Sequence, residues 1–242
     1  MSNSNTRTLD IAAVGLMAGS SGRRAAVRRW AWLGLVAQAV FVASWLVAAS
    51  WQGPRYSVVA HTISDMSAVT APHGALLVVV LTLCGAATMG FALRSVWSAL
   101  RTGGWRAATG SVLLALSIVG LGDLLSPAER LACRMADPGC TATQQLSNTG
   151  GQLDNAISSL GLLLLVIAAF FLAAAMRRTH GWEGWARPTR WTAVLITAFG
   201  VASVLTQDAG YTGLFERLVA ALGAAALAVL AIGILRRTRD AS

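Results

Sequence analysis

The chain has 242 residues, of which 55% are hydrophobic and only 12% are charged, and its net charge is +9. Soluble domains carry about 25% charged residues, so this composition excludes a soluble monomer, a disordered chain and a secreted disulfide scaffold. The basic residues flank apolar blocks and form no patch with interleaved aromatic residues. We therefore attribute the charge to membrane topology and expect no nucleic acid partner.

Six apolar blocks predict six transmembrane helices, over residues 30–51, 73–93, 107–125, 156–176, 191–205 and 218–235. A helix rises about 1.5 Å per residue, so most of these blocks can cross a hydrocarbon core of about 30 Å. The fifth block is the shortest, and we expect it to extend past Thr206 or to cross where the bilayer is thin. No block alternates as a barrel strand does, so the sequence predicts an all-α, polytopic six-helix bundle.

The arginine distribution predicts the orientation of the bundle. Fifteen of the nineteen basic residues lie in the two tails and in the second and fourth loops, whereas the first, third and fifth loops hold seven of the ten acidic residues. Cytoplasmic flanks of membrane proteins are enriched in basic residues. Both termini are thus expected to face the cytoplasm, in a bacterial inner membrane. We expect a flexible tail over 1–29 without a cleavable signal peptide, a membrane domain over 30–235 and a short tail over 236–242.

The first outer loop, residues 53–74, has the pattern of a short amphipathic helix at the membrane interface. Ser57 is a plausible N-cap, and the helix would end before Pro72. On such a helix one arc is apolar and the opposite arc is polar. The apolar arc contains Val58, Val59, Ile63, Met66 and Val69, and the polar arc contains His61, Ser64 and Asp65.

The polar arc of this loop has three interpretations. His61 and Asp65 have i, i+4 spacing with Ser64 beside them, which makes these three residues candidates for catalysis. Asp123, from the third block, is a fourth candidate. A single helix does not by itself align the hydrogen-bond chain of a catalytic triad. In the structural interpretation, Ser57 caps the helix while His61 and Asp65 bind loop backbone. In the third interpretation, the loop binds a ligand or metal together with residues of other loops.

Ionisable residues from several segments are expected at this same side of the membrane. Asp123 lies near the outer end of the third block, Asp154 just before the fourth and Asp208 just after the fifth, and His73 starts the second. A divalent metal is a candidate cofactor, with His61, His73, Asp123 and Asp154 as candidate ligands. Because Asp123 lies in an apolar run, its carboxylate needs a partner, for which Arg55, Arg130 and His61 are candidates.

The three cysteines divide into a pair and a single residue. Cys133 and Cys140 lie in the third loop, on the side expected to be oxidising, and we expect a disulfide between them. A zinc pair is less favoured, because the spacing is wider than that of Cys-x-x-Cys sites. Cys84 lies inside the second block and is expected to be a small packing residue.

Several short motifs resemble a prokaryotic membrane family known as domain of unknown function 998. They are Tyr56-Ser57, Ile63-Ser64, Asp137-Pro138 and Leu153-Asp154-Asn155. The resemblance covers most of the chain from 30 to 235, and it implies six spans and an outer polar site. The family typically has Leu-His-Asn where this chain has Leu153-Asp154-Asn155. If the family uses that His as a ligand or base, this chain either replaces it with a carboxylate or has lost the activity.

These observations leave several functions open. The first is binding of a lipid or other amphiphile at the outer end of the bundle, at a site drawn from Tyr56, Ser57, His61, Ser64, Asp65, His73, Asp123, Asp154, Asn155 and Asp208. The second is a metal-assisted intramembrane hydrolase. The third is a structural subunit of an envelope complex, and the expected partners are membrane lipid, a second copy or envelope proteins. An ion-coupled transporter ranks lowest, because alternating access normally needs polar or discontinuous helices near the midplane, and the interiors of these blocks offer few polar residues.

Overall fold

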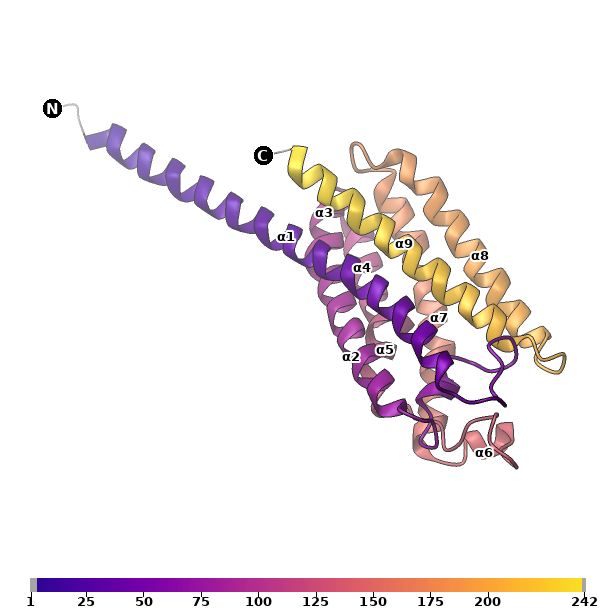
Figure 1. The fold of residues 1–242 in the computed structure, drawn as a ribbon. Helices are drawn as coiled ribbons and strands as arrows, with labels where there is room; N and C mark the ends of the chain where they lie inside the picture. Colours follow the sequence, from indigo (N-terminus) through magenta and orange to yellow (C-terminus); the bar gives the residue numbers. More distant parts are fainter. Residues whose placement is uncertain (1–3, 241–242) are drawn as a thin grey trace.

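The computed structural model describes the backbone of residues 4–240 and the side chains of residues 22–239. It is built from helices, with no strand in that range, and six of them are long and apolar enough to cross a membrane (Figure 1). These spans are Gly22–Ser50, Gly74–Gly103, Trp105–Leu125, Thr149–Met176, Glu183–Leu205 and Thr212–Arg239. The predicted all-α class and the six spans are confirmed, and the chain is a multipass membrane protein.

The main helices pack as neighbouring pairs along the chain, with the last helix closing against the first. They are α1 (Ser4–Ser50), α2 (Gly74–Gly90), α4 (Trp105–Leu116), α7 (Thr149–Met176), α8 (Ala186–Leu205) and α9 (Thr212–Asp240). Helix α4 packs on α7, α7 on α8, α8 on α9, and α1 on both α9 and α2. Both chain ends lie at one end of the bundle, the termini end, and the opposite end carries residues 51–73, 126–148 and 206–211 and is called the loop end (Figure 1).

Helix α1 is longer than the first predicted span. It begins at Ser4 and projects from the bundle, so the segment expected as a flexible tail is helical from residue 4 onward (Figure 1). No proline occurs between Ser4 and Ser50, and nothing in that stretch forces the helix to stop. The ends of the two predicted tails, residues 1–3 and 241–242, lie outside the described residues.

The third span is interrupted, which the sequence analysis did not predict. After α4 the backbone of Ser117 is extended, with φ −74° and ψ 177°, and the chain continues as the π-helical segment η4 (Ile118–Gly122) and as α5 (Asp123–Leu125). Two glycines of neighbouring helices face this break. A Cβ atom on Gly85 would lie 2.4 Å from the Leu124 nitrogen, and one on Gly161 would lie 2.7 Å from the Ile118 nitrogen. Only residues without a side chain allow α2 and α7 to approach so closely.

The fifth span gains its length at the opposite end from the one expected. Helix α8 ends at Leu205 and does not extend past Thr206, whose hydroxyl donates to the Ala202 carbonyl. It begins instead at Ala186, after the 3-10 turn η5 (Glu183–Trp185). Pro188 falls in the first turn, where a missing backbone N–H costs little, so the helix starts before it without strain.

The interior is mainly apolar, and most of its few polar side chains are satisfied, whereas the buried Ser111 Oγ and Trp45 Nε1 have no hydrogen-bond partner among the described residues. Gln38 of α1 donates to the hydroxyl of Thr88 in α2 over 3.0 Å. Ser44, Thr82 and Thr197 each donate to a carbonyl of their own helix. The lone cysteine, Cys84, is buried in α2, in agreement with a packing role.

Candidate functional site

The first loop does not form the amphipathic α-helix predicted for it. A single turn starts at Ser57, whose carbonyl accepts from the His61 N–H over 2.8 Å. The helix does not continue, because the Ile63 backbone N–H donates to Oε2 of Glu216 over 2.9 Å and not to a carbonyl of its own turn. The loop then continues in turns to the short 3-10 helix η1 (Ser64–Ser67). The helix fails because side chains from distant elements bind the backbone groups that would extend it.

The predicted faces of this loop are partly wrong. Ile63 and Met66 are buried as expected, but Val58 and Val69 of the same arc are 48% and 56% exposed. Asp65, expected on the polar outer arc, is fully buried next to Met66. A buried carboxyl needs hydrogen-bond donors, and the third loop supplies them.

Arg217 of α9 holds the first loop against the bundle. Its Nη1 donates to the carbonyls of Val58 (2.8 Å) and His61 (2.7 Å), and its Nη2 donates to the Tyr56 hydroxyl. Burial raises the pKa of Tyr56 to about 12, and the Arg217 charge only partly opposes this. The hydroxyl thus stays protonated and donates to the Thr62 carbonyl over 3.1 Å.

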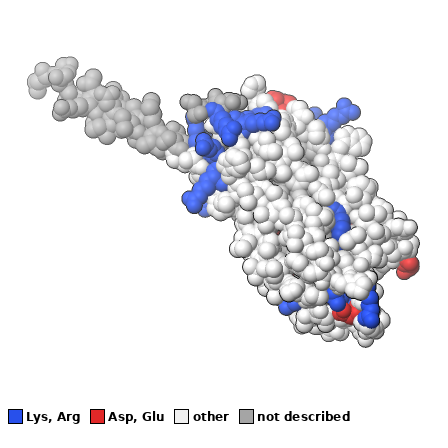
Figure 2. Space-filling model, in the orientation of Figure 1, with Lys and Arg blue, Asp and Glu red and all other residues white. Residues whose placement is uncertain are grey.

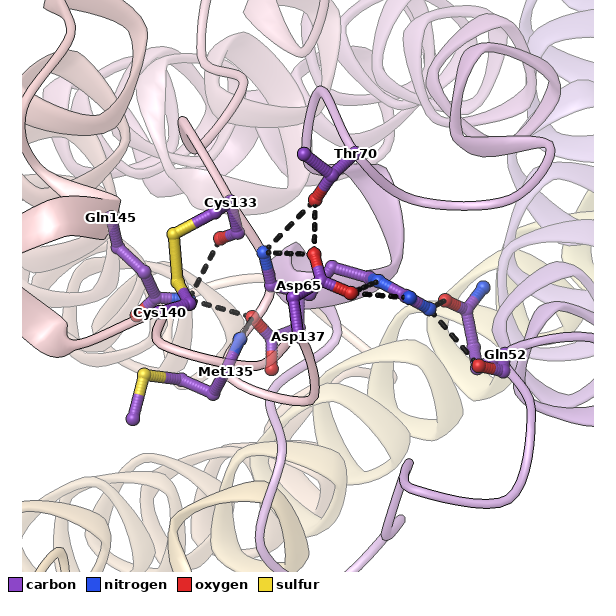
Figure 3. Close-up of polar contacts among 9 residues, drawn as sticks. Gln52, Asp65, Thr70, Cys133, Met135, Asp137, Cys140 and Gln145 are labelled. Atoms are coloured by element: carbon purple, nitrogen blue, oxygen red, sulfur yellow. Dashed lines mark hydrogen bonds and ion pairs between the residues drawn. A yellow bond between two sulfur atoms is a disulfide. The ribbon is translucent and has the colours of Figure 1, made fainter.

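The third loop contacts the first through Asp65 (Figure 3). Its Oδ1 accepts from the Met135 N–H over 3.0 Å and from Nε2 of Gln145 over 2.6 Å. Burial raises the pKa of Asp65, and these two hydrogen bonds oppose the rise. Cys133 and Cys140, which frame this segment, form the predicted disulfide.

An ion pair beside the disulfide ties the third loop to the end of α1. Arg134 binds Asp137 over 2.5 Å and also donates to the backbone and side chain of Gln52 (Figure 3). Burial alone would raise the pKa of Asp137, but hydrogen bonds from Arg134 and Thr70 outweigh it, and the pKa is lowered. The first and third loops therefore form one cross-linked cap over the loop end.

His61, Ser64 and Asp65 do not form a catalytic chain. His61 Nδ1 accepts from the Ser57 N–H over 3.0 Å, and the Ser64 hydroxyl pairs with that of Thr62 over 3.0 Å. In the described part of the chain, no hydrogen bond joins the three side chains to one another. His61 and Asp65 bind loop backbone, which is the contact pattern of the structural interpretation.

Beneath this cap lies a cavity of about 120 Å³, lined by the first and third loops and by residues of the spans. Four carboxyl side chains line it, from the third span, the loop after it, α7 and α9, and they are Asp123, Glu129, Asp154 and Glu216. Four serines also line it, and they are Ser64, Ser67, Ser126 and Ser158. The remaining lining is apolar or glycine, and none of the lining residues is basic. We call this the acidic cavity.

Glu129 has the smallest exposed fraction of these four carboxyl residues. It is only 7% exposed, and its Oε1 has no hydrogen-bond partner among the described residues. Burial, reinforced by the nearby negative charge of Asp154, raises the pKa of Glu129 to about 8. An unpaired carboxyl in such a place either keeps a proton or requires a cation.

The structure brings three of the predicted binding residues into the acidic cavity, namely Ser64, Asp123 and Asp154. Tyr56, Ser57, His61 and Asp65 belong to the cap and do not line it. His73 is exposed, with its ring centroid 5.7 Å from that of Trp51, and Asn155 and Asp208 are exposed as well.

Two of the three proposed partners of Asp123 bind other groups, and the third, Arg55, is exposed. Arg130 donates to the carbonyls of Ser67 and Ala68, and His61 accepts from Ser57. Among the side chains of residues 22–239, no three His, Cys, Asp or Glu groups are placed to hold a metal ion. The predicted ligand set of His61, His73, Asp123 and Asp154 is therefore not assembled here.

Comparison with known proteins places the chain in a family. The family model described as "Protein of unknown function (DUF998)" matches residues 35–233. The chain belongs to the DUF998 family. The resemblance seen in the sequence is thereby confirmed, and every residue that lines the acidic cavity lies within the matched range. No curated protein and no solved structure matches the chain.

Proposed function

We propose that this DUF998 protein binds an amphiphile whose polar end is a small cation, in the acidic cavity. The observation that carries the proposal is the buried, unpaired carboxyl oxygen of Glu129 in a cavity lined by three further carboxyls. An ionised carboxylate out of water is costly unless a positive charge compensates it. Because none of the lining residues is basic, the compensating charge has to be a proton or a ligand.

The apolar part of the lining supports an amphiphile rather than a bare ion. Phe41, Leu81, Val119, Leu165 and Val219 contribute to the wall from several spans. A site of this kind, with a few polar groups among apolar side chains, suits a ligand with one polar and one apolar end. The cavity volume of about 120 Å³ suits a head group and the first carbons of a chain, with the rest of the chain among the spans.

The metal-assisted hydrolase has less support. Although four carboxyls share one cavity, no three metal-binding side chains within residues 22–239 lie close enough for one ion. The two outer histidines, His61 and His73, do not line the cavity. The amphiphile proposal needs only the carboxyls and the apolar wall.

A matched series of ten-carbon ligands tests the proposal on the purified full chain in a neutral maltoside detergent. Decylammonium should bind saturably and raise the melting temperature, whereas decanol, with the same chain and no charge, should not. Glu129→Gln should weaken decylammonium binding at least tenfold, because the carboxylate that pairs with the ammonium is gone. Asp208→Asn, at an exposed acid of the loop end outside the cavity, should bind as the wild type does.

Three results would contradict the proposal. Equal affinities for decanol and decylammonium would show that charge has no role. A rise in melting temperature with sodium ions alone as large as that with decylammonium would indicate an ion site. Equal effects of Glu129→Gln and Asp208→Asn would indicate a general surface attraction.

We further infer that both termini face the cytoplasm of a bacterial inner membrane. Fifteen of nineteen arginines flank the termini end, and the disulfide between Cys133 and Cys140 lies at the loop end. A reporter fused after Ser242 that is active only in the cytoplasm should be active, and its periplasmic counterpart should be silent. The opposite pattern would overturn the orientation.

A further inference from the structure

A second hollow lies at the termini end, far along the bundle from the acidic cavity. It has a volume of about 660 Å³ and is bounded by α1, by the end of the second span and by α9. Five arginines line it, and they are Arg23, Arg24, Arg94, Arg101 and Arg237. None of the residues that line it is acidic. We call this hollow the arginine groove, and Figure 2 shows basic side chains gathered at this end of the molecule.

The charge of the groove points to an anionic ligand with oxygen acceptors. Guanidinium groups gathered around one hollow repel one another, and an anion between them lowers that repulsion. The planar, forked guanidinium matches phosphate in a bidentate manner, and it keeps its charge under all ordinary conditions. Among the described residues, Glu183 lies outside the lining of the groove, with its carboxylate 3.7 Å from Nδ1 of His180. A phosphate group is therefore the chemistry that this groove fits best.

One of the arginines is held in place by neighbouring groups. The Arg237 guanidinium lies 4.0 Å from the ring centroid of Trp182 and donates to the Gly181 carbonyl. Stacking on an aromatic ring leaves the other edge of the guanidinium available for a ligand and reduces the entropy lost on binding. This part of the groove is thus preorganised in the absence of a ligand.

The remainder of the lining favours a lipid over a soluble anion. Leu93, Val27 and Ile234 give the groove an apolar floor, and Trp97 at its edge is 45% exposed. A tryptophan near the end of a span is typical of the head-group level of a bilayer, where the phosphates of lipids lie. A soluble phosphate would use the arginines but would leave the apolar floor uncovered.

We propose that the arginine groove binds the head group of an anionic phospholipid, with lipid acyl carbons on its apolar floor. Five positive charges exceed the charge of one phosphodiester, so a lipid with two phosphates should bind more tightly than a lipid with one. This site is separate from the acidic cavity and does not depend on the function proposed for it.

The test measures binding of a fluorescent cardiolipin, which carries two phosphates, to the full chain in neutral detergent. Unlabelled cardiolipin, phosphatidylglycerol, phosphatidylcholine and inorganic pyrophosphate serve as competitors. We expect cardiolipin to compete best, phosphatidylglycerol about tenfold less well, and the other two weakly. The double substitution Arg94→Gln with Arg101→Gln should weaken binding at least tenfold, because each lost arginine removes a charge-assisted contact.

The matched control is Arg187→Gln with Arg190→Gln. These arginines are exposed at the same end of the bundle, at the start of α8, and they do not line the groove. The control should bind cardiolipin within twofold of the wild type. Both double variants should retain the wild-type melting temperature in lipid-free detergent. If the groove double variant does not, the single substitution Arg101→Gln takes its place in the binding test. Equal losses in the two pairs, or pyrophosphate competing as well as cardiolipin, would overturn the proposal.

Discussion

Replacing Arg217 with alanine is expected to destabilise the protein by about 3 kcal/mol or more, which corresponds to a fall of roughly 6–12 °C in melting temperature. The side chain is 8% exposed, and it donates to two first-loop carbonyls and to the Tyr56 hydroxyl. Its loss leaves these partly buried acceptors without a donor, and an unsatisfied acceptor costs more than its hydrogen bond contributes. Thermal unfolding in detergent, followed by tryptophan fluorescence, measures the effect.

Two further substitutions separate the contacts of Arg217 from its charge. Arg217→Lys keeps the charge but loses the forked geometry, so it should fall between the wild type and the alanine variant. Arg55→Ala removes an exposed arginine of the same loop end and should change stability by less than about 0.5 kcal/mol. A wild-type melting temperature for Arg217→Ala would show that the first loop is held by other contacts.

Two features of the fold were predictable because their signals are local or compositional. A helix that crosses a membrane needs a long apolar run, and each of the six runs is visible in the sequence. The disulfide was predictable because Cys133 and Cys140 are close in sequence and share one loop.

The conformation of the first loop was not predictable from its own residues. The apolar spacing after Ser57 is that of a helix, and one turn does form. The Glu216 carboxylate, however, takes the Ile63 N–H from a position 153 residues away along the chain. Tertiary hydrogen bonds of this kind override the local pattern of apolar residues, and the sequence between 53 and 74 does not predict them.

The acidic cavity was half predictable. Asp123 and Asp154 stood out because they border apolar runs, whereas Glu129 lies in a loop and Glu216 directly precedes a basic residue. Such positions usually indicate solvated charge. On α9, however, consecutive residues point in directions about 100° apart, so Arg217 reaches the first loop while Glu216 lines the cavity.

The break at Ser117 has no sequence marker either. Its segment contains no proline, and glycine is common throughout the spans. The close approach of Gly85 and Gly161, from two other helices, accompanies the interrupted path. The interruption also brings Ile118, Val119 and Asp123 to the cavity wall, so the break in the third span is part of the candidate site.

The second large effect concerns Glu129 and pH. Burial, together with the charge of Asp154, raises the pKa of Glu129 to about 8 from an ordinary 4.5. Between these values the folded protein holds a proton that the unfolded chain has released, so stability should fall as pH rises from about 5 to 8 and then level off. The slope from this one group is at most about 1.4 kcal/mol per pH unit. Melting temperatures between pH 5 and 8.5 should show it.

Glu129→Gln should remove this part of the slope and should be more stable than the wild type at pH 8, because no charge is then buried. Burial also raises the pKa of Asp65, which adds a slope of the same sign to both proteins. The difference between the two profiles therefore reports the contribution of the Glu129 charge, including its effect on neighbouring carboxyls. A variant profile parallel to that of the wild type would contradict the assignment.

Ligand affinity should have the opposite pH dependence to stability. A cation pairs only with the ionised carboxylate, so the affinity of the wild type for decylammonium should rise up to tenfold per pH unit and level off near pH 8. An alkylammonium ion resembles the lysine side chain, with a pKa of about 10.4, and remains charged throughout this range. In Glu129→Gln the Glu129 contribution to this rise should be absent. If the affinity of the wild type instead fell with pH, alongside its stability, the proton on Glu129 would be favouring the ligand, and its head group would be an acceptor rather than a cation.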